Sequence, residues 1–466
     1  MNGVLNPVKP GMIFVLFLFC LTWAGAQGVH AALLDGLLDD VEESLAEGLS
    51  EKGEKLTTGN FYTDDKPNAH APIGMMGDHT HEAGEIMFSY RLMQMYMEGT
   101  RIGNDSVSND VARDYGKSVF ASTFPDHACV TGHDCHVAGY RVLPTSMRMW
   151  MHMFGFMYGW NDTVTLTLMV PYLQNSMDHE RNDGVKFTTR SEGFGDLRFG
   201  SLWRLWAVEA PSLGAHRFHM NLSLSVPTGS IEPTAVAPVA HDGSPREIRL
   251  PYPMHLGSGT VDFYPGITYG GEMGRASWGV QAIGALRLET NSNNFSKGDA
   301  YTINVHGAYE LIPDTLSSSV RLSWNHWDAY DGFDSQINRQ HLCHTPAANG
   351  MHGHMDNGHM DNGHMDNGHM HNGHMMEHDG HMMSDSGHVC LHHGELDHAH
   401  PTVQTAFPNL LGGQRLDIMF GLNVLFPDFM GLENRLAVEG GFPIYQYLDG
   451  QLETDSVVTF GWQAVY

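Results

Sequence analysis

A stretch rich in histidine and methionine between residues 341 and 400 carries the strongest chemical signal in the chain. It holds 16 of the 31 histidines, and its core repeats the five-residue unit Asp-Asn-Gly-His-Met, beginning with residues 356–360. Each copy offers an imidazole, a thioether and a carboxylate. Thioethers select Cu(I), whereas imidazole also accepts Cu(II), zinc or nickel. The repeat therefore predicts that copper or a similar soft metal binds here, without being a required cofactor.

The predicted ligands of this stretch are its imidazole and thioether groups. Asn-Gly pairs favour turns over a packed strand or helix, which predicts a loop with several weak to moderate sites. The alternative is a repeat that arose by replication slippage and only holds water. The candidate ligands are His352, His354, Met355, His359, Met360, His364, Met365, His369, Met370, His371, His374, Met375, His378 and His381.

A second candidate metal site precedes the first predicted strand. Asp78, His79 and His81 form a potential chelating trio of one carboxylate and two imidazoles. The alternative is that the same polar linker plugs or caps the domain that follows. The sequence does not favour either interpretation over the other.

Four cysteines follow the N-terminal region, and each predicted pair falls within one loop. We expect disulfides joining Cys129 to Cys135 and Cys343 to Cys390, because an even number of cysteines in an exported protein favours such bonds. Thiolate ligands to a metal remain the alternative.

The N-terminus and the overall charge indicate export and exclude nucleic acid as a partner. Residues 1–26 read as a signal peptide, with Lys9 before an apolar stretch and Ala24-Gly25-Ala26 as cleavage box; residue 31 is the alternative end. The net charge of -28 disfavours nucleic acid, which requires a clustered basic face, and suits cations.

The elements that must position these groups are β-strands. From residue 85 onward side chains alternate between apolar and polar, most clearly from Thr163 to Tyr172. Short connections alternate with mostly long ones, and the last strand ends on aromatic Tyr466, as outer-membrane barrels do. The predicted strands are 85–97, 146–158, 162–172, 195–206, 215–227, 258–270, 275–288, 299–311, 316–329, 413–427, 433–446 and 453–466.

The fold predicted from this pattern is all-β, an antiparallel transmembrane outer-membrane β-barrel of about twelve strands with long extracellular loops. Residues 27–84 would form a periplasmic N-terminal segment and residues 85–466 the barrel. Residues 330–410 would be an extracellular loop containing the His/Met repeat. An even number of strands puts both termini in the periplasm.

Methionines at every second position of the first two strands raise a further possibility. In the first strand Arg91 shares its face with Met93 and Met95, so the arginine marks that face as luminal, because a charge facing lipid costs about 2–4 kcal/mol. In the second strand the methionines from Met147 to Met157 share one face, but its direction is ambiguous. A luminal thioether ladder, an apolar lining for aromatic compounds and an ordinary lipid-facing surface all remain open.

An enzymatic function is not predicted. His219, Asn221, Ser223 and Ser225 share one face of the fifth strand, and a lipid hydrolase could use such groups. That face is the luminal one, opposite Phe218 and the leucines, whereas a hydrolase acting on membrane lipid would need the outer face.

Several short segments, spread from about residue 69 to the C-terminus, resemble the outer-membrane, transporter-like family named for the meta-pathway of phenol degradation. This resemblance implies transport of aromatic compounds and identifies no catalytic residues. The segments are Ala71–His79, Phe88–Arg91, Pro171–Tyr172 with Asn175–Asp178, Gly193–Asp196, Pro227–Ser230, Leu250–Met254 with Gly257–Thr260, and Leu452–Asp455.

Together these features predict a channel or transporter in the bacterial outer membrane whose surface loop binds copper or a similar soft metal. One alternative is a diffusion channel for hydrophobic aromatic compounds. Another is a surface protein that sequesters metal without transport. The expected partners are outer-membrane lipid and either metal ions or small hydrophobic molecules.

Overall fold

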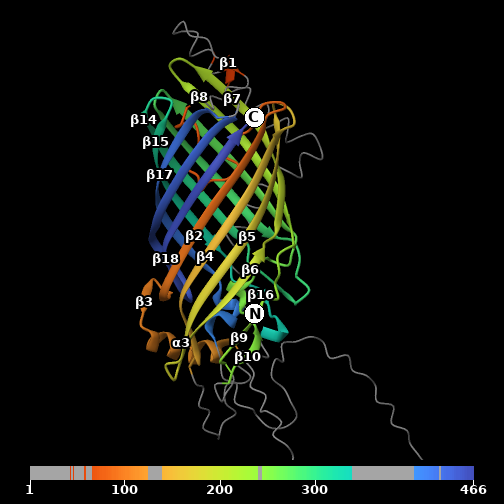
Figure 1. Cartoon of the computed structure of the whole chain (residues 1–466), viewed down its shortest axis with the longest axis vertical. Coiled ribbons are helices and arrows are strands. Elements are labelled where there is room, and N and C mark those ends of the chain that lie inside the picture. The colour runs from red at the N-terminus through yellow and green to blue at the C-terminus, as the bar shows by residue number, and fades with distance from the viewer. Residues whose placement is uncertain are drawn as a thin grey trace, which may run out of the picture.

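The computed structural model describes residues 42–43, 46, 57–58, 66–123, 139–239, 244–337, 403–429 and 432–466. Within them the chain forms a closed, tall antiparallel β-barrel (Figure 1). The predicted signal peptide, all the cysteines and the His/Met repeat lie outside the described residues.

Eleven strand elements make up the wall of the barrel, and the remaining short elements lie at its ends. The wall strands are β2 (Ile86–Gly103), β4 (Val142–Gly159), β5 (Val164–Arg181), β7 (Leu197–Ala210), β8 (Gly214–Val226), β11 (Asp262–Met273), β12 (Ala276–Arg287), β14 (Ala300–Ile312), β15 (Leu316–Trp327), β17 (Gly413–Phe429) and β18 (Leu432–Val465). The short elements are β1 (Thr57–Thr58), β3 (Asp105–Val107), α3 (Asn109–Thr123), β6 (Lys186–Phe194), β9 (Thr234–Ala237), β10 (Arg246–Arg249), η3 (Tyr252–Met254), β13 (Phe295–Ser296), β16 (Asp331–Gly332), η4 (Gln404–Ala406) and η5 (Pro408–Leu410).

Each wall strand pairs with the next along the chain, and the pairing of the last wall strand, β18, with the first, β2, closes the barrel. The long element β18 crosses the wall twice. It pairs with β17 as far as Leu448, and from Leu448 onward it pairs with β2. The reversal lies at Gly450, whose φ of 77° suits glycine. Counted as crossings of the wall, the strands therefore agree with the predicted number of about twelve.

The strands alternate between a lipid-type outer surface and a polar interior. Leu166 and Leu168 of β5 point outward and are 40% and 41% exposed. Thr165, next to Leu166 in the same strand, points inward and is fully buried. The same alternation recurs in β15, where Val320 and Leu322 point outward and Arg321 points inward. An apolar exterior around a polar interior is the construction of outer-membrane barrels. Among the described helices, none combines the length and the apolar character needed to cross a membrane.

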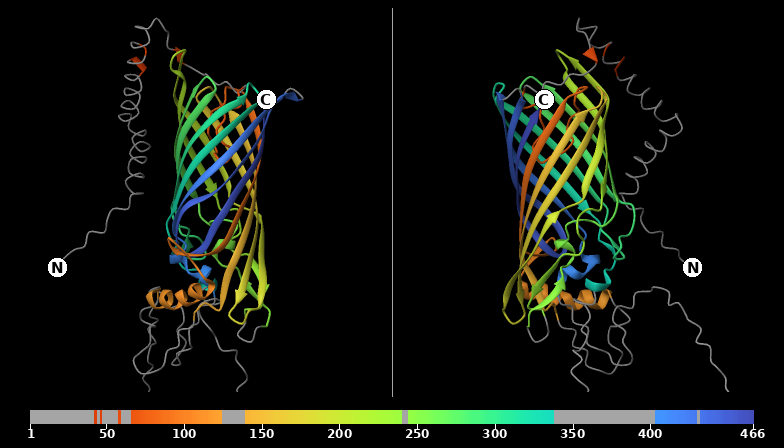
Figure 2. Two further views of the ribbon diagram at one scale, coloured as in Figure 1. Left: turned by 90° about the vertical axis from the view of Figure 1, so that its left-hand side faces the viewer. Right: turned by 45° about the vertical axis from the view of Figure 1, so that its right-hand side comes forward.

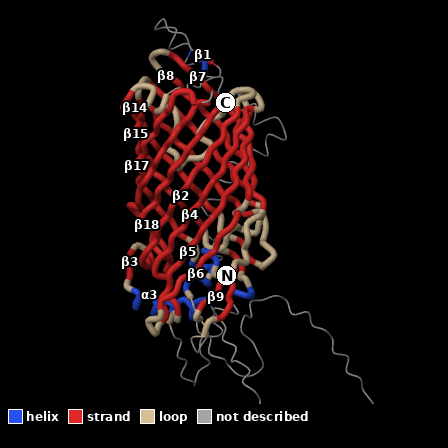
Figure 3. The backbone as a smooth tube through the Cα atoms, in the orientation of Figure 1, coloured by secondary structure: helices blue, strands red, loops and turns tan. Residues whose placement is uncertain are grey.

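The two ends of the barrel differ (Figures 2 and 3). The short-turn end carries the turns at 160–163, 211–213, 274–275 and 313–315, together with the C-terminus. The long-loop end carries α3, the β9–β10 hairpin and the three short 3-10 helices, and α3 lies across it. An apolar cluster packs beneath these loops, with Tyr252, Phe295 and Ile337 almost fully buried.

The connections at the long-loop end contain more regular structure than the sequence analysis expected. The expected loop 98–145 contains the helix α3, and the expected loop 173–194 is instead a hairpin of β5 and β6. Both β2 and β4 also extend beyond their predicted bounds toward this end. β5 also extends past its predicted end, and the alternation of polar and apolar residues fades there because polar side chains lie on both faces, as Asp178 and His179 illustrate.

We predict that a charge placed on the outer surface will destabilise the barrel. Leu322→Arg should lower the free energy of unfolding in lipid by about 2–4 kcal/mol, because an arginine facing the hydrocarbon region is poorly solvated. Trp160→Arg at a short turn, where Trp160 is 65% exposed, is the control and should cost much less. Denaturant titration of the folded and unfolded bands in detergent gels measures both. Equal effects would contradict the lipid-facing assignment.

Candidate functional site

Residues 66–84 form a segment that we call the plug, and most of its residues from Pro67 to His81 are buried inside the barrel. Its backbone carbonyls accept hydrogen bonds from side chains of several wall strands. Gly77 O lies 2.9 Å from His219 Nε2 and accepts a bond of 2.7 Å from Asn221, while Met76 O accepts one of 2.9 Å from Gln281. The plug thus contacts β8 and β12, and its bond from Gly74 to Glu439 adds β18, which is distant from both in the sheet order. The sequence predicts a periplasmic segment over residues 27–84, with a plug or cap as the alternative for the linker that contains Asp78, His79 and His81; residues 67–81 are placed as a plug.

Two glycines let the plug fit closely against the wall. Gly77 has a φ of 61°, and a Cβ there would lie 2.8 Å from the side-chain amide of Asn221. A Cβ on Gly74 would lie 2.2 Å from Glu439 Oε2 and 2.3 Å from Arg321 Nη2. Both glycines belong to Ala71–His79, one of the segments that carry the family resemblance.

Charged residues of the wall hold the other side of the plug. Arg321 of β15 binds both carboxylate oxygens of Glu439 of β18 at 2.8 Å, and Glu439 in turn accepts a hydrogen bond of 3.0 Å from the backbone N–H of Gly74. Arg435 donates to Ala71 O at 2.6 Å and to Gln463 and Asn423 of the wall. Because these groups are buried, losing one partner would leave a costly unpaired charge.

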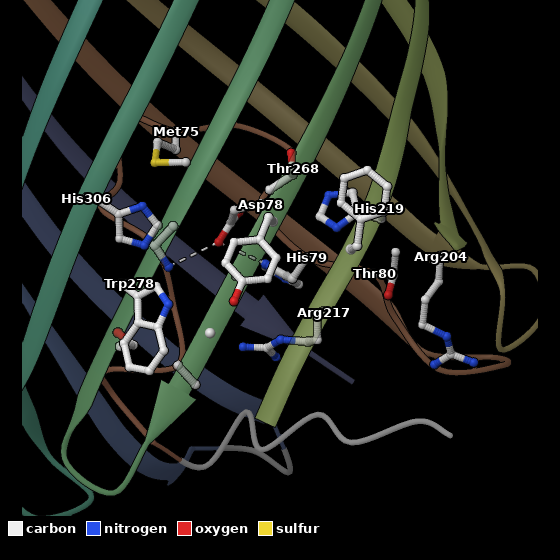
Figure 4. A pocket seen from close by; sticks show the side chains of 17 residues that line it. Met75, Asp78, His79, Thr80, Arg204, Arg217, His219, Thr268, Trp278 and His306 are labelled. Carbon is white, nitrogen blue, oxygen red and sulfur yellow. Dashed lines mark hydrogen bonds and ion pairs between the residues drawn. The ribbon is translucent and has the colours of Figure 1, made fainter. Parts of the chain in front are cut away.

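Histidines concentrate where the plug meets the wall (Figure 4). His79 Nδ1 lies 3.1 Å from Asp78 Oδ2, and the His79 ring contacts His70 and His81 edge-on at centroid distances of 5.7 and 4.8 Å. A cavity of about 30 Å³ lies beside them, lined also by His219 and His306. A cavity of that size has room for only a few water molecules.

The predicted trio of Asp78, His79 and His81 is brought together, but not in the arrangement of a chelating site. Asp78 pairs with His79, whereas His81 Nδ1 lies 3.0 Å from Glu85 Oε1. Among the described residues, no three His, Cys, Asp or Glu side chains are placed to hold one ion. The luminal face of His219, Asn221, Ser223 and Ser225 is buried as predicted, and its first two members bind the plug.

Between the plug and the long-loop end, much of the lumen is lined by polar and charged groups. Arg415 pairs with Asp417 on β17 at 2.8 Å, and Arg287 pairs with Asp262 on the neighbouring strands β12 and β11. The guanidinium of Arg198 lies 3.8 Å above the ring of Tyr264, a cation–π contact. Together with Arg321 and Glu439, these residues form what we call the polar wall.

The opposite lining is made of methionines, and we call it the methionine wall. Met87 and Arg91 of β2 are buried while Phe88 is 54% exposed, so the alternate methionines of β2 face the lumen. On β4 Arg148 is exposed and Met147 is 3% exposed, which settles the ambiguous direction of that strand. The register pairs methionine with methionine across the two strands. The pairs are Met87 with Met157, Met93 with Met151, Met95 with Met149, and Met97 with Met147.

A network of hydrogen bonds, not predicted from the sequence, joins three of the segments that carry the family resemblance. Asp196 accepts bonds from the backbone N–H of Gly229 at 2.9 Å and of Ser258 at 2.7 Å, and from the Ser258 hydroxyl at 2.9 Å. Thr228 donates to Gly195 O at 2.8 Å. The recurrence of Gly, Asp, Ser and Thr in these segments was the available signal, since such residues favour local side-chain to backbone bonds.

Comparison with known proteins identifies barrels of similar construction but no family. No family model matches the sequence, and no curated protein does. An outer-membrane channel from Pseudomonas putida F1 aligns over 84% of this chain and 98% of its own, at 9% identity and a TM-score of 0.45. A mutant of the monoaromatic hydrocarbon channel TodX aligns over 88% and 96%, at 9% identity and 0.33. A Pseudomonas aeruginosa FadL homologue aligns over 82% and 90%, at 9% identity and 0.30.

The buried contact between Asp78 and His79 makes the docking of the plug sensitive to pH. Burial lowers the pKa of His79, the charge of Asp78 opposes this effect, and His81 and Arg435 lower the pKa further. Burial alone would raise the pKa of Asp78, but His79, Arg435 and Arg91 outweigh it and hold that pKa well below its usual value. A solvated histidine titrates near pH 6.5, so below about that pH a displaced plug binds a proton that the docked plug excludes.

We therefore predict that docking weakens as the pH falls from 7.5 to 5.5. Hydrogen exchange of backbone amides in residues 71–79, corrected for the intrinsic effect of pH, should speed up in the native chain. His79→Asn should reduce that pH dependence, because asparagine does not titrate in this range. Identical protection at both pH values in the native chain would contradict the assigned role of His79.

Proposed function

We propose that this chain is a channel of the bacterial outer membrane that conducts small, weakly polar molecules, aromatic compounds in particular. The alternation of an apolar outer surface with a polar interior supports the membrane placement. In such barrels the periplasmic turns are the short ones, so the short-turn end and the plug would face the periplasm. The long-loop end would then face the outside of the cell.

The methionine wall is the observation that carries the proposed substrate class. Interiors of water-filled barrels are polar, so rows of methionine on β2 and β4 call for an explanation. Met93, Met95, Met149 and Met151 keep part of their surface accessible inside the lumen. Thioethers are polarisable and adapt their shape, and each sulfur–aromatic contact stabilises by about 0.3–1.5 kcal/mol. A ring could move along this wall while its polar substituents face the polar wall.

The plug would act as the closed gate of this path. It contacts β5 through the hydrogen bond of His81 N to Thr165, and β15 through that of Ser317 to Pro67 O. Passage therefore requires the plug to shift, or at least to loosen its contacts on one side. The family resemblance noted in the sequence, in which the plug segment takes part, points to the same substrate class.

Replacing the middle of the methionine wall by glutamine tests this proposal. In proteoliposomes carrying the triple variant Met95→Gln, Met149→Gln and Met151→Gln, benzoate flux should fall roughly fivefold, because about 1 kcal/mol of contact with the ring is lost. Flux of arabinose, a polar solute of similar size, should not fall with it. Retention of benzoate flux, or an equal loss of both fluxes, would contradict the proposed role of the wall.

A second function is proposed for the His/Met repeat, which lies outside the described residues: binding of copper at the cell surface. Its support is the repeated pairing of imidazole and thioether groups along residues 352–381. It attaches to the barrel through β15 and β17, at the long-loop end. Metal binding by the loop does not require transport and is compatible with the channel.

We expect a peptide of residues 349–383 to bind Cu(II) more weakly at pH 5 than at pH 7.5, since imidazole binds metal only when neutral and titrates near pH 6.5. Cu(I) should lose much less affinity, because thioethers do not titrate in this range. Competition titrations with each ion measure both affinities. An equal loss for both ions would exclude the thioethers as ligands, and absence of binding would leave a hydrated repeat.

A further inference from the structure

Five methionines from four separate segments meet in one buried cluster at the long-loop end of the methionine wall. Met147 and Met177 lie on β4 and β5. Met254 is the last residue of the short helix η3, which lies at the long-loop end. Met97 and Met149 pack against them. We call this group the thioether cluster; it is completed by apolar Leu250, Ala235 and Leu452.

The cluster is more enclosed than the rest of the wall. Met147, Met177 and Met254 are 3%, 1% and 0% exposed. The register places Met97, Met147 and Met177 side by side on three adjacent strands. Met254 is held against them by two hydrogen bonds. Its backbone N–H donates to Pro251 O, and its carbonyl accepts a bond of 2.7 Å from the Ser191 hydroxyl. Methionine side chains thus pack together from the wall on one side and from a loop on the other.

Hydrophobic packing alone does not call for methionine at these positions. Leucine fills a buried aliphatic space with less loss of side-chain entropy on folding, and the two residues replace one another with little change in volume. What methionine adds is a soft sulfur donor. Thioethers bind Cu(I) and bind hard cations poorly, and a thioether carries no charge that must be neutralised on burial.

We propose that the thioether cluster is a binding site for a soft monovalent cation, Cu(I) or the chemically similar Ag(I). Three sulfurs on adjacent strands and the fourth from Met254 supply the donors, and the flexible side chains move inward to meet the ion. The cluster lies between the lumen and the long-loop end, the end that bears the His/Met repeat. This proposal rests on the proposed channel for the route by which an ion reaches the site, whereas binding of the ion depends only on the thioethers.

The charges near the cluster agree with a monovalent rather than a divalent ion. Arg415 contacts Met95, the methionine that precedes Met97 on the luminal face of β2, with a guanidinium nitrogen 3.9 Å from its sulfur. Its charge is largely balanced by Asp417, at 2.8 Å. None of the clustered residues supplies a carboxylate or an imidazole. A divalent ion, which needs stronger charge compensation, is therefore disfavoured.

The test uses the full chain in detergent with its methionine methyl groups labelled with ¹³C. Added Ag(I), at pH 5 so that the histidines of the loop compete weakly, should shift the methyl resonances of Met97, Met147, Met149, Met177 and Met254, assigned through single Met→Leu variants. Mg²⁺ should shift none of them. Absence of these shifts would overturn the proposal. Because the measurement uses the unaltered chain, a misfolded variant could not be the reason for their absence.

A matched pair of variants gives the second measurement. Met147→Leu with Met177→Leu and Met254→Leu should lose one tightly bound Ag(I) per chain in equilibrium dialysis. Met87→Leu with Met157→Leu, which removes the two methionines of the cluster at the short-turn end, should retain it. Equal Ag(I) binding by both variants would overturn the site. Benzoate flux through the unaltered chain without metal tests the channel separately, so failure of either proposal can be distinguished.

Discussion

The alternation of side chains along a closed barrel is the constraint on which the rest of this structure depends. A strand that crosses lipid must satisfy its backbone within the sheet, and its side chains then point outward and inward in turn. Arg91 fixes which face of β2 is inward, and the unbroken register of β2 with β4 carries that assignment to the next strand. The luminal position of the methionines follows directly from this geometry.

A second consequence concerns the plug. Its backbone enters a lumen from which much of the water is displaced, so its N–H and C=O groups need partners. The wall provides them from opposite sides, with His219 and Asn221 at Gly77, and Glu439 at Gly74. The side chains that line this part of the lumen are therefore already engaged, which explains why Asp78, His79 and His81 bind neighbours rather than forming an open chelating site. Opening of the proposed channel would require breaking these hydrogen bonds, whereas the strands of the barrel would stay folded.

Most of the barrel could be predicted from the sequence because period-two alternation and short turns are local signals. The bounds of the strands toward the long-loop end could not, because Asp178, Thr188 and other polar residues there face water on one side. Helix α3 was missed because it is a single helix within a region rich in polar residues, where no apolar face stands out in the sequence. The contacts of the plug join residues as distant as Gly74 and Glu439, and no local pattern reveals such a pairing. The chemistry of the methionines was visible in the sequence, but their convergence with Met254 required the fold.

The central claim is that residues 66–84 close a path for solutes whose lining includes the methionine wall. Ion conductance of single barrels in a planar bilayer tests it most directly, comparing the full chain with one lacking residues 66–84. The account predicts that the full chain conducts poorly and intermittently, and that removal of the segment gives a larger, steady conductance that benzoate reduces while it occupies the lumen. An unchanged conductance after removal of the segment would contradict the account, because the plug would then not be what closes the path.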